Sequence, residues 1–129
     1  MIINTGLPLA GGVRFSSGSY TGTGTYGEAN PCSLTFDFTP KIVMVFQAPT
    51  SGSEGNILVK SGEYPFFVQN MDLLTTEFVS GRGFGSGYRS ALPKGKKSSD
   101  GKTVSWFSTT SQWNQLNVAD TTYCWFALG

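Results

Sequence analysis

The residue types that most often carry out catalysis are sparse in this sequence. The chain contains no histidine, so it lacks the commonest general base and the commonest metal ligand. A Ser-His or Cys-His nucleophile is therefore impossible within the chain. Carboxylates remain for paired acid–base chemistry, namely Asp37, Glu63, Asp72 and Asp120. All but Asp37 lie in or beside expected loops, where a solvated acid is the ordinary explanation. We expect no catalytic residues and no enzymatic activity.

Two glycine-containing segments look like phosphate-binding loops without meeting their requirements. Gly22-Thr-Gly-Thr-Tyr-Gly27 has the spacing of a dinucleotide-binding turn, which needs a helix directly after it. The chain continues with Glu28-Ala-Asn-Pro31, and proline disfavours helical backbone in the residue before it, so a turn is the better interpretation. Gly95-Lys-Lys-Ser98 lacks the earlier glycine of a phosphate loop. Two distant cysteines cannot make a zinc site, and we expect neither a metal nor a cofactor.

Aromatic residues among amides or arginines are better candidates for ligand binding. Trp113 is flanked by amides, and an indole can stack on a sugar while the amides bond its hydroxyls. Tyr88 lies near two arginines in a glycine-rich stretch. Trp113 can instead pin a loop to the core, and the arginines can simply keep a loop soluble, so both interpretations stay open. The candidate ligand-binding residues are Arg82, Tyr88, Arg89, Gln112, Trp113 and Asn114.

The composition limits the class of protein. A chain of 129 residues forms one domain, and 17 glycines favour turns over helices. The net charge of +1 offers no field to hold a polyanion, so we expect no nucleic-acid partner. No apolar run approaches a membrane span, and the N-terminus shows no signal-peptide pattern. Two cysteines are too few for a disulfide scaffold, so Cys32 and Cys124 are expected to be two buried thiols. A bridge stays open if the fold brings their Cα atoms within about 6 Å.

The run from Leu34 to Phe46 gives the strongest structural signal. Its first half alternates apolar and polar residues, which is the two-residue period of a strand with one wet face. Its second half, Ile42 to Phe46, is apolar throughout, so we expect a strand covered on both faces. Pro40 and Lys41 separate the two strands as a turn.

A further strand is expected to begin at 13–15 and to be interrupted at Gly18, with Tyr20 able to resume it. Other short strands are expected at 56–60, 65–70, 103–108 and 122–128. Residues 71–78 could form a helical turn but are more often non-helical at this length, and 80–102 are expected to form one long loop or a ragged hairpin. Together these elements predict an all-β protein, an antiparallel β-sandwich of about six to seven strands. Residues 1–12 are expected to be a loose lead-in to a single domain at 13–129.

Adjacent bulky residues in the last strands indicate a second apolar layer. Trp106-Phe107 and Trp125-Phe126 place large side chains on both faces of their strands. One face meets the core, and the other needs a further layer or another subunit. An oligomer interface is the favoured explanation in so small a chain.

The order of these parts resembles the H-type lectin domain. The matching features are Phe36-x-Phe38-x-Pro40 followed by the apolar run, and the ending Tyr123-x-Trp125-x-Ala127-x-Gly129. The segment from Ser19 to Gly27 is also similar to terminal domains of phage tail fibres. The resemblance implies a β-sandwich, a homotrimer, and sugar binding or host attachment. The binding residues of that family do not align here, so none is transferred.

We therefore expect a phage or prophage tail-fibre-type receptor-binding module that attaches to a bacterial surface glycan. Its expected partners are two further copies of itself, a surface polysaccharide or other receptor, and other tail proteins, with no membrane insertion. It would be made in the host cytoplasm and function in the virion tail. The alternative is a structural virion component, such as a collar, baseplate or fibre-joining protein, that binds no ligand.

Overall fold

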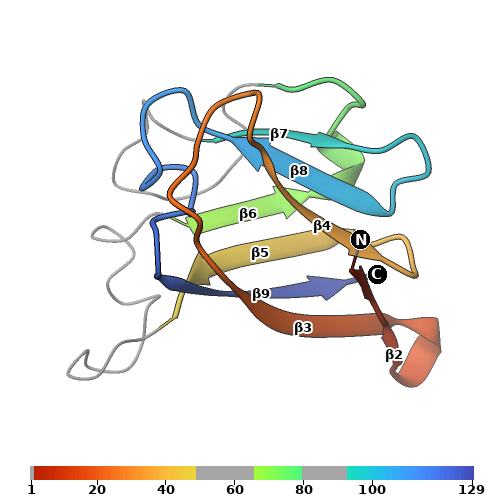
Figure 1. Ribbon diagram of the computed structural model, residues 1–129. Helices are drawn as coiled ribbons and strands as arrows, with labels where there is room; N and C mark the ends of the chain where they lie inside the picture. Colours follow the sequence, from red (N-terminus) through yellow and green to blue (C-terminus); the bar gives the residue numbers. More distant parts are fainter. Residues whose placement is uncertain (1, 49–65, 80–92) are drawn as a thin grey trace.

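The chain folds as two stacked β-sheets in a computed structural model that describes residues 2–48, 66–79 and 93–129 (Figure 1). One sheet has the order β1 (Ile3–Asn4), β4 (Cys32–Phe36), β8 (Thr103–Phe107), β7 (Lys94–Lys97). The other has the order β2 (Leu7–Pro8), β3 (Arg14–Thr21), β9 (Thr122–Leu128), β5 (Ile42–Gln47), β6 (Phe66–Asn70). Neighbouring strands are antiparallel except β1 and β4. The predicted antiparallel sandwich is confirmed, with two additional strands of two residues each.

Helical structure in the described ranges is confined to two 3₁₀ turns, η1 (Ala10–Gly12) and η2 (Met71–Leu73). The second begins at Asn70, whose side-chain oxygen accepts a hydrogen bond from the backbone N–H of Asp72 at 3.0 Å. Within the segment 71–78, only these first three residues are helical. No helix in the described part of the chain is long and apolar enough to cross a membrane.

Strands β4 and β5 follow the alternation of the sequence but belong to different sheets. Leu34 and Phe36 point into the core, while Thr35 is half-buried on the outside. The chain then crosses between the sheets at Pro40, which is buried. In β5, Val43 and Val45 are fully buried, whereas Ile42 remains 43% exposed. The described residues thus fully cover only one face of the strand that was expected to be covered on both.

The core is built from aromatic pairs that join the two sheets. Phe67 of β6 stacks on Trp106 of β8 with ring centroids 5.2 Å apart. Phe36 of β4 meets Trp125 of β9 edge-on at 5.5 Å. Such stacked and edge-on contacts are the favoured geometries for aromatic rings, and they fix the two sheets against each other.

Strand β3 is continuous, and the expected interruption at Gly18 is wrong. Gly18 pairs with Trp125 across the ladder between β3 and β9. A Cβ atom at this position would lie 2.7 Å from Cζ2 of the indole, closer than real contacts allow. The glycine therefore makes room for the ring of Trp125 instead of breaking the strand.

The first residues are an integral part of the sandwich. Strand β1 pairs with β4 in one sheet, and β2 pairs with β3 in the other. Asp37 accepts a hydrogen bond from the Gly6 backbone N–H at 2.7 Å, which holds the link between them. This segment closes one side of the sandwich near the end where the two termini lie (Figure 1). Further along, residues 16–21 of β3 and 32–34 of β4 have no strand partner on that side among the described residues.

The outer faces of the two sheets differ in chemistry. The four-stranded sheet presents hydroxyls, with Thr35 and Thr103 hydrogen-bonded at 2.9 Å, and lysines on β7. Phe107 on this face is buried because Phe78 packs edge-on against it at 4.6 Å. Its second apolar layer is therefore supplied within the chain, and Lys96 adds a cation–π contact 4.5 Å from the Phe78 ring.

The outer face of the five-stranded sheet carries no charged side chain at any described position, and most of its side chains are apolar. The strand register aligns its apolar side chains in rows across neighbouring strands. We call this surface the apolar outer face, and its apolar members are Leu7, Phe15, Ile42, Met44, Phe46, Val68, Cys124, Phe126 and Leu128.

Three further predictions concern the segment 80–102, the strand at 56–60 and the two cysteines. In the segment 80–102, expected to be one long loop or a ragged hairpin, Lys94–Lys97 form strand β7 and turn into β8. Residues 80–92 lie outside the described residues. The strand expected at 56–60 lies outside the described residues. Cys32 and Cys124 are free thiols, each half-buried.

Candidate functional site

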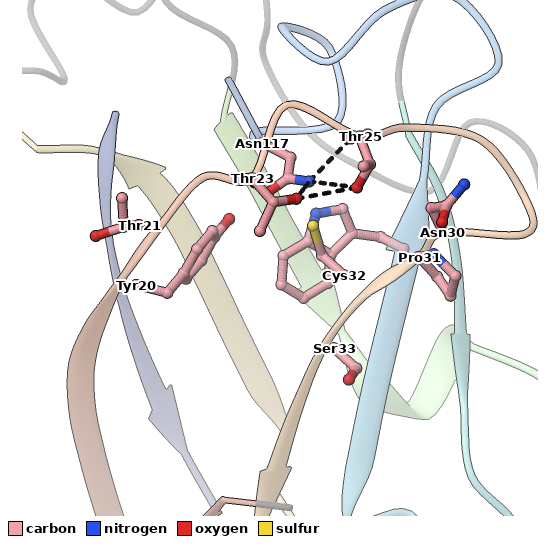
Figure 2. Close-up of a pocket in the computed structure, with 10 residues that line it drawn as sticks. Tyr20, Thr21, Thr23, Thr25, Asn30, Pro31, Cys32, Ser33 and Asn117 are labelled. Carbon is pink, nitrogen blue, oxygen red and sulfur yellow. Dashed lines mark hydrogen bonds between the residues drawn. The ribbon is translucent and has the colours of Figure 1, made fainter. Parts of the chain in front are cut away.

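A pocket of about 330 Å³ opens on the side of the sandwich between β3 and β4 (Figure 2). It lies where neither strand has a strand partner on that side in the part of the chain that the structure describes, and the loop 22–31 crosses over it from one sheet to the other. None of the described residues that line the pocket is charged. Its lining residues are Tyr20, Thr21, Thr23, Thr25, Asn30, Pro31, Cys32, Ser33, Trp106 and Asn117.

The buried side chain of Gln115 holds the frame of this pocket. Its Oε1 accepts hydrogen bonds from the backbone N–H groups of Gly27 and Ser108, both at 2.9 Å. Its Nε2 donates to the carbonyl of Asn30 at 2.7 Å. One amide thus ties the second half of the crossing loop to the end of β8. Its Nε2 also donates to the Cys32 sulfur at 3.8 Å, so all four hydrogen-bonding positions of the amide are used.

Asn117 fixes the first half of the same loop. Its Nδ2 donates to Thr23 Oγ1 and to the carbonyl of Thr25, both at 2.8 Å (Figure 2), and its Oδ1 accepts from the Thr23 backbone N–H at 3.0 Å. Between the two amides, Leu116 adopts a φ of 58°, a left-handed conformation that is costly for a bulky residue. This backbone conformation is held by the hydrogen bonds on both sides.

Two aromatic rings lie beneath the pocket, where Trp106 is fully buried and Tyr20 is half-buried. The Trp106 indole donates from Nε1 to the Gln115 carbonyl at 2.9 Å, and the Tyr20 hydroxyl donates to the Leu116 carbonyl at 2.8 Å. Tyr20 also stacks on Tyr123 at 5.3 Å. Burial raises the pKa of the Tyr20 phenol far above its usual range, so the ring presents a neutral hydroxyl.

Cys32 lies at the back of the pocket. Burial raises the pKa of its thiol to about 11, against a smaller lowering from the Gln115 side chain. The thiolate is the reactive form of cysteine, so at neutral pH this group is a weakly polar thiol. The pocket therefore presents neutral donors and acceptors beside aromatic surface.

The rim carries polar groups that are not used in the frame. The side chains of Thr21, Asn30 and Ser33 are exposed and have no hydrogen-bond partner among the described residues. Small-molecule sites typically combine an apolar or aromatic floor with a few such placed polar groups in a volume of this order. The arrangement suits a small, uncharged, hydroxyl-rich ligand.

None of the ligand-binding residues expected from the sequence is among the described residues that line the pocket. Arg82, Tyr88 and Arg89 fall outside the described residues. Gln112, Trp113 and Asn114 are half-buried in the loop 109–121 and do not line the pocket. The Asn114 amide donates to Thr110 Oγ1 at 2.9 Å, and Gln112 Oε1 accepts from the Ala119 N–H at 3.4 Å.

The carboxylates with conceivable acid–base roles have ordinary positions. Asp37 binds Gly6, while Asp72 and Asp120 are exposed, and Glu63 is outside the described ranges. Within those ranges no group of three or more acidic or cysteine side chains could hold a metal ion.

Sequence reasoning did not identify Gln115 and Asn117. A usable signal existed, because two amides alternate around the apolar Leu116, and buried amides demand hydrogen-bond partners. Comparison of the chain with protein-family models, curated proteins and solved structures finds no match.

Proposed function

We propose that this chain is a non-catalytic receptor-binding module of the phage tail-fibre type and that its pocket binds a neutral sugar of a bacterial surface glycan. The observation that carries the sugar-binding part is a pocket with no charged lining among the described residues, in which free hydroxyl and amide groups lie beside the half-buried ring of Tyr20. The biological setting rests on the sequence resemblance described above.

The position of the pocket supports an attachment role. The chain termini lie together at one end of the strands (Figure 1). The pocket lies towards the other end, because it is lined by the last residues of β3 and the first residues of β4. A module attached through its termini would therefore present the pocket away from its point of attachment.

Glycan binding can be tested in two stages. A glycan array and isolated cell-wall polysaccharides would first identify a ligand, and calorimetry would then measure its affinity. Asn30→Ala removes an exposed amide at the pocket rim and is expected to weaken binding about tenfold, the effect of losing one to two hydrogen bonds. Asn114→Ala is the matched control in the loop 109–121, and it should leave affinity unchanged.

Thiol footprinting locates the ligand without a mutation. A sugar in the pocket should slow the reaction of Cys32 with a maleimide, while Cys124 on the far sheet keeps its rate. Absence of binding to any glycan at high protein concentration would overturn the proposed function. Weakening by Asn114→Ala but not by Asn30→Ala would instead move the site to the motif at residues 112–114.

A structural virion component is the second candidate, and the apolar outer face favours it. A collar, baseplate or fibre-joining protein needs a docking surface and no ligand. Labelled antibody on intact particles would separate the two functions, because a receptor-binding module should be found at an exposed distal end.

A further inference from the structure

We propose that the apolar outer face is the surface through which this chain associates with a second copy of itself. This inference goes beyond glycan binding and does not depend on it. It begins from a contrast within one molecule: the outer face of the four-stranded sheet carries lysines and hydroxyls, and its large ring at Phe107 is covered by Phe78. Among the described residues, no segment covers the apolar outer face in the same way.

The arrangement of the surface is that of an interface. Met44 lies in register with Phe126 on one side and Val68 on the other, so apolar side chains form a continuous row across three strands. Serines on β3 and Asn70 at the end of β6 border this row. An apolar centre with aromatic and methionine side chains, no charge and a polar border is the usual anatomy of a specific interface.

The size of the surface is sufficient for a pair of chains. Strands lie about 4.8 Å apart and rise about 3.3 Å per residue, so four strands at the length of β9 cover roughly 450 Å² of flat area. Two copies face to face would bury about 900 Å² of flat area, and the projecting side chains add to this. The total is close to the roughly 1,000 Å² expected of a specific interface.

A second copy is the occupant that fits this chemistry. The face is uncharged, so it offers no electrostatic complementarity to a charged partner. Sheets pack readily on sheets, at about 10 Å separation with their strands roughly aligned. A copy of the same sheet supplies a surface of equal size, polarity and twist.

Light scattering on the purified chain is the direct test. We expect twice the chain mass of 13.8 kDa at micromolar concentration, the mass of a face-to-face pair. Met44→Glu places a carboxylate at the centre of the face and should reduce the mass to that of one chain. Ser105→Glu places the same charge on the outside of the other sheet, opposite Lys96, and should leave the oligomer intact. Circular dichroism would verify that both variants fold.

The wild-type chain provides a test that does not depend on the folding of a variant. Cys124 lies on the apolar outer face and Cys32 lies in the pocket. Dilution through the dissociation range should accelerate the maleimide reaction of Cys124 several-fold and leave that of Cys32 unchanged. A monomeric wild type, an unchanged mass for Met44→Glu, or equal acceleration of both thiols would overturn the proposal.

Discussion

Gln115→Leu should destabilise the protein strongly, although the two side chains are similar in size. Leucine fills nearly the same space, so the change removes hydrogen bonds and leaves little cavity. The N–H of Ser108, a residue only 3% exposed, loses its acceptor with no route to water, which costs about 1–3 kcal/mol. Gly27 and Asn30 lose one hydrogen bond each near the surface, at about 0.5–1.5 kcal/mol apiece.

The sum is a loss of about 2–6 kcal/mol from a total stability on the order of 5–15 kcal/mol. For a domain of this length, each kcal/mol corresponds to roughly 4 °C in Tm, so the melting temperature should fall by roughly 8 °C or more. Urea unfolding followed by tryptophan fluorescence, together with calorimetry, would measure both quantities.

Gln112→Leu is the matched control in the same loop. The Gln112 side chain makes one long hydrogen bond of 3.4 Å to an exposed residue, so the variant should lose no more than about 0.5 kcal/mol. Equal losses for the two variants, or a loss below about 1 kcal/mol for Gln115→Leu, would refute the assignment of Gln115 as the residue that holds the pocket frame.

Two further predictions concern β3 and the pocket thiol. Gly18→Val should destabilise the protein by about 1–3 kcal/mol, because its side chain would displace the Trp125 ring, whereas Ser19→Val on the opposite face of β3 should have a smaller effect in chemical denaturation. The raised pKa of Cys32 means that the unfolded chain loses this proton first as pH rises, so stability should fall between about pH 9 and 11. Cys32→Ala should flatten that decline, and a decline of the same slope in the variant would contradict the burial of the thiol.

The larger strands could be predicted because their sequences carry a period. Strand β9 occupies the expected residues 122–128, and β4 shows the expected alternation. The two-residue strands β1 and β2 carry no period, and Lys94-Gly-Lys-Lys97 has no strand-like pattern of its own. These segments become strands through register with a partner and, for β7, through contacts between lysines and aromatic rings.

The amides Gln115 and Asn117 could have been noticed in the sequence, but their partners in the candidate site could not be predicted, for a related reason. Its frame joins residues 83 to 94 positions apart in the chain, and no local pattern reports such contacts. The interruption expected at Gly18 was wrong because the local cost of glycine in a strand is outweighed by the ring that lies over it. The sequence did indicate a second apolar layer over the last strands. The structure shows half-buried and exposed apolar side chains on the apolar outer face, where such a layer would pack.

The placement of pocket and termini at opposite ends of the strands has a mechanical consequence. A load between a ligand in the pocket and an attachment at the termini runs along the strands instead of across them. The ladder between β3 and β9 pairs residues from Phe15 with Leu128 to Thr21 with Thr122. Under such a load these hydrogen bonds are sheared together, so they share the force and do not open one after another.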